Sequence, residues 1–218
     1  MTSPKQNVWF VSGIDTDAGK TVATGWLARR WMDEGFTVAT VKLVQTGAPD
    51  GRSPDIAVHR RIMGVTLPED AEGLTAPALF DYPASPHLAA AMEKRTLDLQ
   101  AVLRAIETVS GRYDRVLVEG AGGLMVPLTE DLLTIEFAAR QHWPVVFVTS
   151  GRLGSINHTL LALEAMAARG MRLSHLVWNE HHPSPDAAID ADTYRYLDAW
   201  RAKHWPETGM LRCPAIGL

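Results

Sequence analysis

Residues 8–21 read VWFVSGIDTDAGKT, a short apolar run followed by a loop rich in glycine and aspartate. The apolar run, residues 8–12, contains β-branched and aromatic side chains and predicts a buried strand. Residues 21–34 have helical periodicity and are followed by Gly35, a residue typical of helix ends. The loop at residues 13–21 therefore joins a strand to a helix, which is the setting of a phosphate-binding loop (P-loop).

The composition of this loop suits phosphate oxygens. Its backbone N–H groups and the positive end of the following helix dipole attract anions. Gly19 allows close approach of the backbone, Lys20 can reach the terminal phosphates of a nucleotide, and the Thr21 hydroxyl can bind Mg²⁺. Five residues separate Gly13 from Gly19 where the common pattern has four, so a chance strand–turn–helix remains an alternative.

The rest of the chain continues the alternation of strands and helices. We expect further strands at residues 37–41, 115–118, 145–149 and 173–178, and helices at residues 55–63, 86–93, 97–110, 134–141, 156–169 and 186–203. An irregular connection is expected before residue 86 and an irregular C-terminus after residue 203. Strands separated by helices pair in parallel through right-handed crossovers. The sequence therefore predicts one α/β domain over residues 1–218, a doubly wound, mostly parallel sheet with helices on both faces, as in P-loop NTPases.

Polar residues gather where the predicted strands end. Lys42 follows the second strand, Glu119 the third and Asn179 the last. Ligands of such sheets bind beyond the carboxyl ends of the strands. Glu119 is followed by Gly-Ala-Gly-Gly and is placed like the second metal-binding acid of P-loop enzymes, although a solvated turn is the alternative. Together with the P-loop, it favours nucleotide binding.

Composition narrows the function classes. The 218 residues carry a formal net charge of −4, which gives no electrostatic support for a nucleic-acid or anionic-membrane partner. The single cysteine, Cys213, excludes an intrachain disulfide and cysteine-rich zinc sites and fits a reducing cytosol. No apolar stretch approaches the roughly 18 residues of a membrane span, and the run at residues 8–11 is too short for a signal-peptide core. We therefore expect a cytoplasmic protein without nucleic-acid or membrane partners.

Six segments resemble, in order and spacing, the motifs of the dethiobiotin synthetase family. They are the P-loop with its five-residue spacing, VKLVQTG at residues 41–47, SPH at 85–87, VEGAGG at 118–123, LGSINH at 153–158 and VWN at 177–179. The resemblance implies an ATP- and Mg²⁺-dependent ligase that converts 7,8-diaminononanoate and CO₂ to dethiobiotin, with release of ADP and phosphate. In that reaction a substrate amine takes up CO₂ as a carbamate, the carbamate attacks the γ-phosphate, and the second amine closes the ring.

The same resemblance implies roles for individual residues. The catalytic residues would be Lys42, Lys20 and Thr16, with the two lysines bracketing the carbamate and the γ-phosphate. The Mg²⁺ ligands would be Thr21, Asp55 and Glu119. The nucleotide would contact Asp17, Ala18, Gly19, Lys20, Thr21, Val22, Asn179 and Pro214. The substrate would contact Thr46, Leu153, Gly154, Ser155 and Asn157, of which the last four form a helix start that receives the substrate carboxylate across a homodimer interface.

Several of these assignments keep an alternative. Asp55 could equally be a helix N-cap, Ser155 a plain N-cap and Thr46 a turn hydroxyl. Asp17 stands where the family usually has Glu, which puts a specific role for it in doubt. The helix at residues 159–167 is apolar nearly all round and needs cover on more than one side, which either a second subunit or the protein's own core could supply.

The C-terminal segment and the P-loop leave two further points open. Residues 209–214 keep only Pro214 of a family segment that helps to hold adenine, so the preference for adenine is not secured. A partition-type ATPase switch that binds a partner protein is the alternative function. Such a switch normally carries a lysine early in its P-loop, where this chain has Asp15. ATP turnover that needs the diamine and bicarbonate would distinguish the ligase from the switch.

Overall fold

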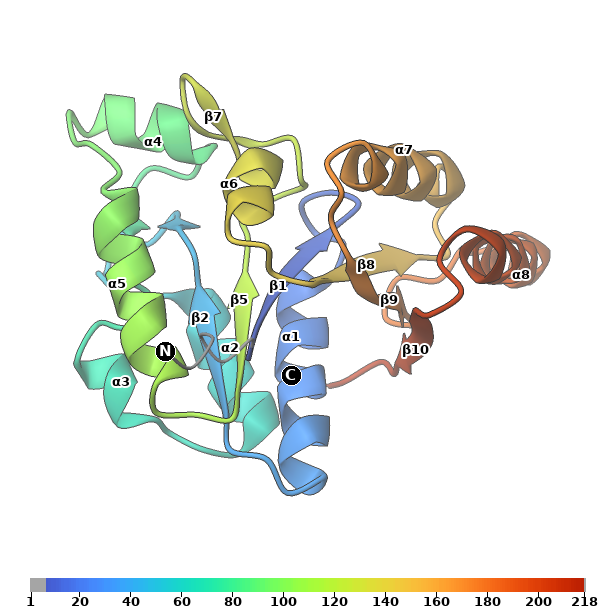
Figure 1. The fold of residues 1–218 in the computed structure, drawn as a ribbon, viewed down its shortest axis with the longest axis horizontal. Coiled ribbons are helices and arrows are strands. Elements are labelled where there is room, and N and C mark those ends of the chain that lie inside the picture. Colours follow the sequence, from blue (N-terminus) through green and yellow to red (C-terminus); the bar gives the residue numbers. More distant parts are fainter. Residues whose placement is uncertain (1–6, 218) are drawn as a thin grey trace.

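The computed structural model describes residues 7–217, so residues 1–6 and 218 of the predicted domain lie outside it. Its centre is a six-stranded, wholly parallel sheet in the order β10-β9-β8-β1-β5-β2 (Figure 1). These strands are β1 (Val8–Gly13), β2 (Val38–Lys42), β5 (Arg115–Glu119), β8 (Val145–Ser150), β9 (Leu173–Asn179) and β10 (Gly209–Cys213). The predicted doubly wound sheet is confirmed. The strand order changes direction beside β1, which is where such sheets bind ligands.

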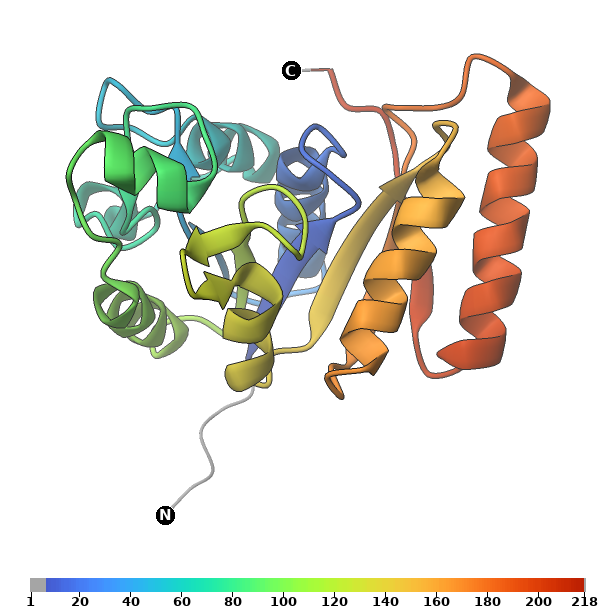
Figure 2. The ribbon, with the colours of Figure 1, turned by 90° about the horizontal axis from the view of Figure 1, so that it is seen from above.

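Helices cover both faces of the sheet because neighbouring strand residues point to opposite faces. On β1, Val11 packs in a core with residues of α1 and α2, whereas Phe10 packs in a second core with residues of α5, α6, α7 and α8. Figure 2 shows the helices arranged on the two sides of the sheet. The helices are α1 (Lys20–Asp33), α2 (Pro54–Met63), α3 (Pro68–Ala71), α4 (Pro86–Met92), α5 (Leu99–Ser110), α6 (Thr134–Arg140), α7 (Ser155–Ala167) and α8 (Ala187–His204). None of the helices described between residues 7 and 217 is long and apolar enough to cross a membrane.

The P-loop lies between β1 and α1, at the carboxyl end of the central strand, as the sequence predicts. Gly19 has a φ of +85°, and a Cβ atom there would lie 1.9 Å from Nδ2 of Asn179. Only glycine combines this left-handed backbone with such a close approach. Residue 19 therefore holds the P-loop directly against the end of β9.

Two regions expected to be irregular contain regular structure, so those expectations are wrong. Residues 43–86 include α3 and the two-stranded parallel pair β3 (Gln45–Thr46) and β4 (Leu79–Phe80). The C-terminus forms β10, the sixth strand of the sheet. A further antiparallel pair, β6 (Pro127–Thr129) and β7 (Leu132–Leu133), was not predicted. Most of these strands are too short to show a period, and β3, β4 and β10 take their hydrogen bonds from partners more than 20 residues away in the sequence.

Candidate active site

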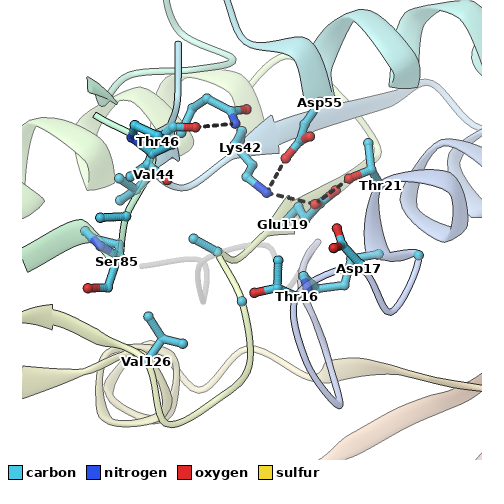
Figure 3. A pocket seen from close by; sticks show the side chains of 18 of the residues that line it. Thr16, Asp17, Thr21, Lys42, Val44, Thr46, Asp55, Ser85, Glu119 and Val126 are labelled. Atoms are coloured by element: carbon cyan, nitrogen blue, oxygen red, sulfur yellow. Dashed lines mark hydrogen bonds and ion pairs between the residues drawn. The ribbon is translucent and has the colours of Figure 1, made fainter. Parts of the chain in front are cut away.

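A cavity of about 770 Å³ opens at the carboxyl edge of the sheet, beside the P-loop (Figure 3). It lies between the starts of α1 and α4 and the ends of β2 and β5. Ten of the residues singled out in the sequence line it, namely Thr16, Asp17, Gly19, Lys20, Thr21, Val22, Lys42, Thr46, Asp55 and Glu119. The structure therefore brings the predicted catalytic and metal-binding residues together at one place.

A network of buried charges forms the floor of this cavity. Lys42 and Glu119 are register partners on the neighbouring strands β2 and β5, so their side chains leave the sheet next to each other. The Lys42 ammonium donates to Glu119 Oε1 at 2.8 Å and to the Gly120 carbonyl at 3.1 Å, and it is also ion-paired with Asp55 (Figure 3). The Thr21 hydroxyl donates to the same Glu119 oxygen at 3.0 Å. One ammonium group is thus held between two carboxylates beside the P-loop hydroxyl.

The environment of each charge shifts its pKa. Burial alone would raise the pKa of the Glu119 carboxyl, but Lys42 and His59 outweigh that effect and lower it well below its usual range. Burial would likewise lower the pKa of Lys42, but Glu119 and Asp55 raise it above its usual value. For Lys20, burial prevails and, with the neighbouring Lys42 charge, lowers the pKa. Lys42 and Glu119 therefore form an ion pair at neutral pH.

Lys20 lies in the P-loop with its ammonium turned toward the loop backbone. Its Nζ donates to the Asp15 carbonyl at 2.7 Å, and the residue is almost fully buried. The hydroxyl of Thr24, one helical turn further, donates to the Lys20 carbonyl at 2.7 Å and fixes the first turn of α1. The Lys20 ammonium thus binds the backbone of its own loop, and Lys20 also lines the cavity.

The structure decides whether Asp55 and Ser155 are helix N-caps, which the sequence left open. The N-cap of α2 is Ser53, whose hydroxyl accepts the Ile56 N–H at 3.1 Å, so Asp55 is not the cap and turns its carboxylate toward Lys42. The N-cap of α7 is Gly154, and the Ser155 hydroxyl pairs instead with Ser150 at 3.2 Å. The interpretation of Ser155 as an N-cap is therefore wrong.

The remaining predicted residues do not line the cavity. Ala18 is buried just behind it, and its carbonyl accepts the side-chain N–H of Asn179 at 3.0 Å. The side-chain oxygen Oδ1 of Asn179 accepts the backbone N–H of His181 at 3.0 Å, which ties the end of β9 to the loop that follows it. Pro214 is exposed after β10.

Residues 153–157, predicted to bind the substrate carboxylate, span the loop before α7 and the first residues of that helix, and they also lie outside the cavity lining. Leu153 is 85% exposed, and Gly154 and Asn157 are exposed as well, whereas Ser155 is buried. Within α7, Leu161 is 62% exposed and Leu163 is fully buried. The nearly all-apolar helix is therefore covered by the core on one side and left open on another.

The sequence predicted no role for the other residues that line the cavity. They are Val44, Gln45, Pro83, Ala84, Ser85, Pro86, Ala121, Gly122, Val126, His181 and His182. Six of them, at residues 44, 45, 85, 86, 121 and 122, lie within the segments that resemble the family motifs, whereas the other five lie outside those segments. His59, which contacts Glu119 from the core, was also missed. Its spacing of four residues from Asp55 on a predicted helix was the available signal.

Comparisons with known proteins agree with this arrangement. The AAA domain family matches residues 7–200. ATP-dependent dethiobiotin synthetase BioD 2 of Pasteurella multocida is 43% identical over 202 residues, which cover 92% of this chain and 94% of that protein. ATP-dependent dethiobiotin synthetase BioD of Chlorobaculum tepidum is 46% identical over 215 residues, which cover 98% of this chain and 87% of that protein.

Solved structures share the fold at much lower identity. The signal recognition particle receptor FtsY of Elizabethkingia anophelis matches with a TM-score of 0.53 and 16% identity, over 96% of this chain and 58% of the receptor. The hydrogenase maturation factor HypB of Archaeoglobus fulgidus matches with a TM-score of 0.52 and 13% identity, over 95% of this chain and 81% of that protein. These likenesses show the P-loop NTPase-like fold alone. The sequence relatives go further, and by their identity and coverage this chain belongs to the dethiobiotin synthetase family.

Proposed function

We propose that this protein is the ATP-dependent ligase that closes the ureido ring of dethiobiotin. Its substrates are 7,8-diaminononanoate, CO₂ and ATP, and its products are dethiobiotin, ADP and phosphate. The observation that carries the proposal is the convergence of Lys20, Lys42 and Glu119 on one cavity beside a P-loop, in a chain of this family.

The proposed reaction has three steps, which are carbamate formation, phosphoryl transfer and ring closure. One substrate amine attacks the carbon of CO₂ and loses a proton, which gives a carbamate. A carbamate oxygen then attacks the γ-phosphorus, and the bond between that phosphorus and the bridging oxygen breaks as ADP leaves. The second amine attacks the carbonyl carbon of this mixed anhydride and loses a proton to solvent, and the bond from that carbon to the phosphate oxygen breaks, so that the ring closes and phosphate leaves.

The chain's own groups suit the charges of these steps. Phosphoryl transfer depends mostly on position and on neutralising oxygen charge. Lys42 keeps its proton because its pKa is raised, so it can hold the anionic carbamate against the γ-phosphate. Lys20 would exchange its bond to the Asp15 carbonyl for phosphate oxygens. Thr16, exposed at the edge of the cavity, would act on the substrate side of the P-loop.

The residues beside Lys42 also fit Mg²⁺. Asp55, Glu119 and the Thr21 hydroxyl are hard oxygen donors, and the two carboxylates already share one cation, the Lys42 ammonium. Within residues 7–217, no group of three or more His, Cys, Asp and Glu side chains forms a metal centre. Mg²⁺ usually keeps several waters, so phosphate oxygens and water would complete a site at Asp55, Glu119 and Thr21. When bound, the ion would neutralise charge on the phosphate oxygens.

For the nucleotide, we assign the phosphates to residues 17–22 and the base to the region of Asn179 and Pro214. The P-loop supplies backbone N–H groups at the start of α1, as phosphate binding requires. Asn179 uses one of its two amide hydrogens on the Ala18 carbonyl, so the other remains for a base. His181 and His182 lie on the cavity wall next to Asn179 and would border the same end of the nucleotide.

The test is to incubate the protein with diaminononanoate, bicarbonate and Mg-ATP and to look for dethiobiotin by mass spectrometry. ADP should appear in equal amount and only when both the diamine and bicarbonate are present. ATP hydrolysis that ignores the diamine would contradict the ligase and favour a partition-type switch. Lys20→Met is the matched negative control, because it keeps the length of the side chain but removes the charge from the P-loop.

We also propose a cytoplasmic homodimer in which the loop before α7 completes the substrate site. One support is the exposure of the apolar side chains of Leu153 and Leu161. The other is the family resemblance, which implies that Thr46 of one subunit and Gly154, Ser155 and Asn157 of its partner bind the same substrate. The proposed compartment rests on the single cysteine, Cys213.

Sedimentation at micromolar concentration tests the homodimer. Leu161→Asp should favour the monomer and lower activity, whereas Tyr196→Asp on α8, also at an exposed position, should change neither. A clean wild-type monomer that makes dethiobiotin would rule the dimer out. Mixing inactive Lys20→Met with an inactive Asn157 variant should restore activity if two chains share each site.

A further inference from the structure

A chain of buried polar groups lies behind Glu119, on the side away from the cavity. His59 is fully buried on α2, four residues after Asp55, so the two side chains lie on the same face of the helix. Its Nε2 lies 2.8 Å from Glu119 Oε2 and its Nδ1 lies 3.0 Å from the Thr40 hydroxyl. His59 thus joins the carboxylate of β5 to the side chain of Thr40 on β2.

The far end of this chain is anchored by a two-point ion pair. Arg60 donates from Nη1 to the Thr40 hydroxyl at 2.8 Å. Its Nε and Nη2 each donate to one oxygen of Asp70, both at 2.8 Å. A bidentate arginine–carboxylate pair has a well-defined geometry, so it restricts the position of the Arg60 guanidinium and of the Thr40 hydroxyl bound to it.

The donors and acceptors in this chain are consistent with a proton on Nε2 of His59. Arg60 can only donate, so the Thr40 oxygen accepts from it and can give its own proton to His59 Nδ1. The other ring nitrogen, Nε2, then carries the proton and donates to Glu119 Oε2. Glu119 is left with its two oxygens divided, Oε2 toward the core and Oε1 toward Lys42 and Thr21.

We propose that His59 is a positioning residue that fixes the Glu119 carboxylate so that Oε1 faces the cation and nucleotide side of the cavity. The inference rests on the proposed function, because it takes Glu119 as a metal ligand. Without His59, Oε2 would be a buried charged oxygen with no donor, and the carboxylate would rotate to share the donors of Oε1. Partners of this kind hold a metal-binding side chain in one orientation, and their loss typically lowers metal affinity by about 10–100-fold.

The decisive experiment compares His59→Gln with His59→Asn. Glutamine can place an amide N–H near the position of Nε2 and keep the bond to Glu119, whereas asparagine reaches only about as far as Nδ1, toward Thr40. Binding of Mn²⁺ in the presence of ADP, measured by electron paramagnetic resonance, reports affinity without turnover. We expect His59→Asn to weaken Mn²⁺ binding about tenfold or more, and His59→Gln to stay within about threefold of the wild type.

A control separates positioning from general packing. Thr159→Val removes another buried hydrogen bond, that between Thr149 and Thr159 at 2.7 Å. Thr149 lies on β8, which is not a neighbour of the strand β5 that carries Glu119, and Thr159 lies on α7. It should lower the melting temperature without changing the Mn²⁺ affinity. In turnover, His59→Asn should raise the Mg²⁺ concentration at half-maximal rate and leave the KM for the diamine unchanged.

Equal Mn²⁺ affinity in the Gln and Asn variants would overturn the proposal and leave His59 as a packing residue. The same holds if both variants lose stability with unchanged metal affinity. If His59→Asn fails to fold, Thr40→Val, which removes the group that holds Nδ1, should show a smaller loss of affinity in the same direction, and no loss would overturn the proposal. A wild type that binds Mn²⁺ and ADP but makes no dethiobiotin would refute the ligase function, and the comparison of variants would still decide the role of His59.

Discussion

On the P-loop side of the cavity the charged side chains are buried and paired with one another, whereas the loop before α7 turns most of its side chains to solvent. Lys42 and Glu119 are almost inaccessible and each makes at least two polar contacts. Leu153 and Asn157, by contrast, are exposed, and neither lines the cavity. The buried charges beside the P-loop are thus paired within one chain, whereas residues 153, 154 and 157 present an open surface.

This difference has an electrostatic reason. A buried charge is stable only with partners and hydrogen bonds around it, so the groups for phosphate chemistry must be arranged when the chain folds. The exposed side chains of the loop before α7 are solvated, so their positions do not depend on buried partners. Mutations on the two sides should therefore differ in kind, with losses of both turnover and stability on one side and changes of substrate binding on the other.

The largest effect is expected for Lys42→Gln. It removes the charge that we assign to the carbamate and the transferred phosphoryl group, so kcat should fall by about 10²–10³-fold or more. ATP affinity should change much less, because the P-loop and Lys20 remain. Steady-state kinetics with a separate measurement of nucleotide binding checks this. Equal losses of ATP affinity and turnover would mark Lys42 as a simple nucleotide contact.

Glu119→Gln should show the dependence of the buried pair on pH. Removing one partner of a buried ion pair typically costs about 3–5 kcal/mol at neutral pH. The pKa of Glu119 is lower in the folded protein than in the unfolded chain, so its contribution is complete above the unfolded value and is lost as the pH falls below it. Urea unfolding should therefore show a constant difference between wild type and Glu119→Gln from pH 7 down to the ordinary carboxyl pKa of 4.5, and a shrinking difference below it. A difference that grows on acidification would contradict the assignment.

Asn157→Ala tests the open side of the comparison. If the start of α7 receives the substrate carboxylate, the loss of one hydrogen bond to a charged group should raise the KM for diaminononanoate by about tenfold. The KM for ATP and the melting temperature should stay close to wild type, because Asn157 is exposed. His158→Ala, the exposed neighbour, is the matched control. An unchanged KM would place the carboxylate elsewhere.

The smallest effect concerns Cys213, which is the register partner of Asn179 on β10. Burial raises the pKa of its thiol to about 12, so almost none of it is thiolate at pH 8. Alkylation by iodoacetamide at that pH should be slow in the folded protein and rapid in urea. Mg-ADP should leave the slow rate unchanged. Rapid native labelling would show that the edge of the sheet next to Asn179 opens readily.

The sequence by itself determined the elements whose signals are local. The apolar run before the P-loop, the periodicity of α1 and the glycine at residue 35 predicted their positions within a few residues. Alternation of strands and helices predicted the parallel sheet, and the chemistry of Lys20, Lys42 and Glu119 predicted which edge carries the site. These signals depend only on neighbours within one or two turns of chain, so they are readable without a structure.

Only the tertiary structure decided the features that depend on distant partners. The short strands β3, β4 and β10 exist because of hydrogen bonds to segments far along the chain, and no periodicity reveals two-residue strands. Ser53, and not Asp55, became the cap of α2, which freed the Asp55 carboxylate for Lys42. The contact of His59 with Glu119 joins residues 60 positions apart, and it required α2 to pack onto the sheet in one orientation. Side-chain contacts of this kind depend on how whole helices and strands pack against one another, and no local pattern of the sequence reports that packing.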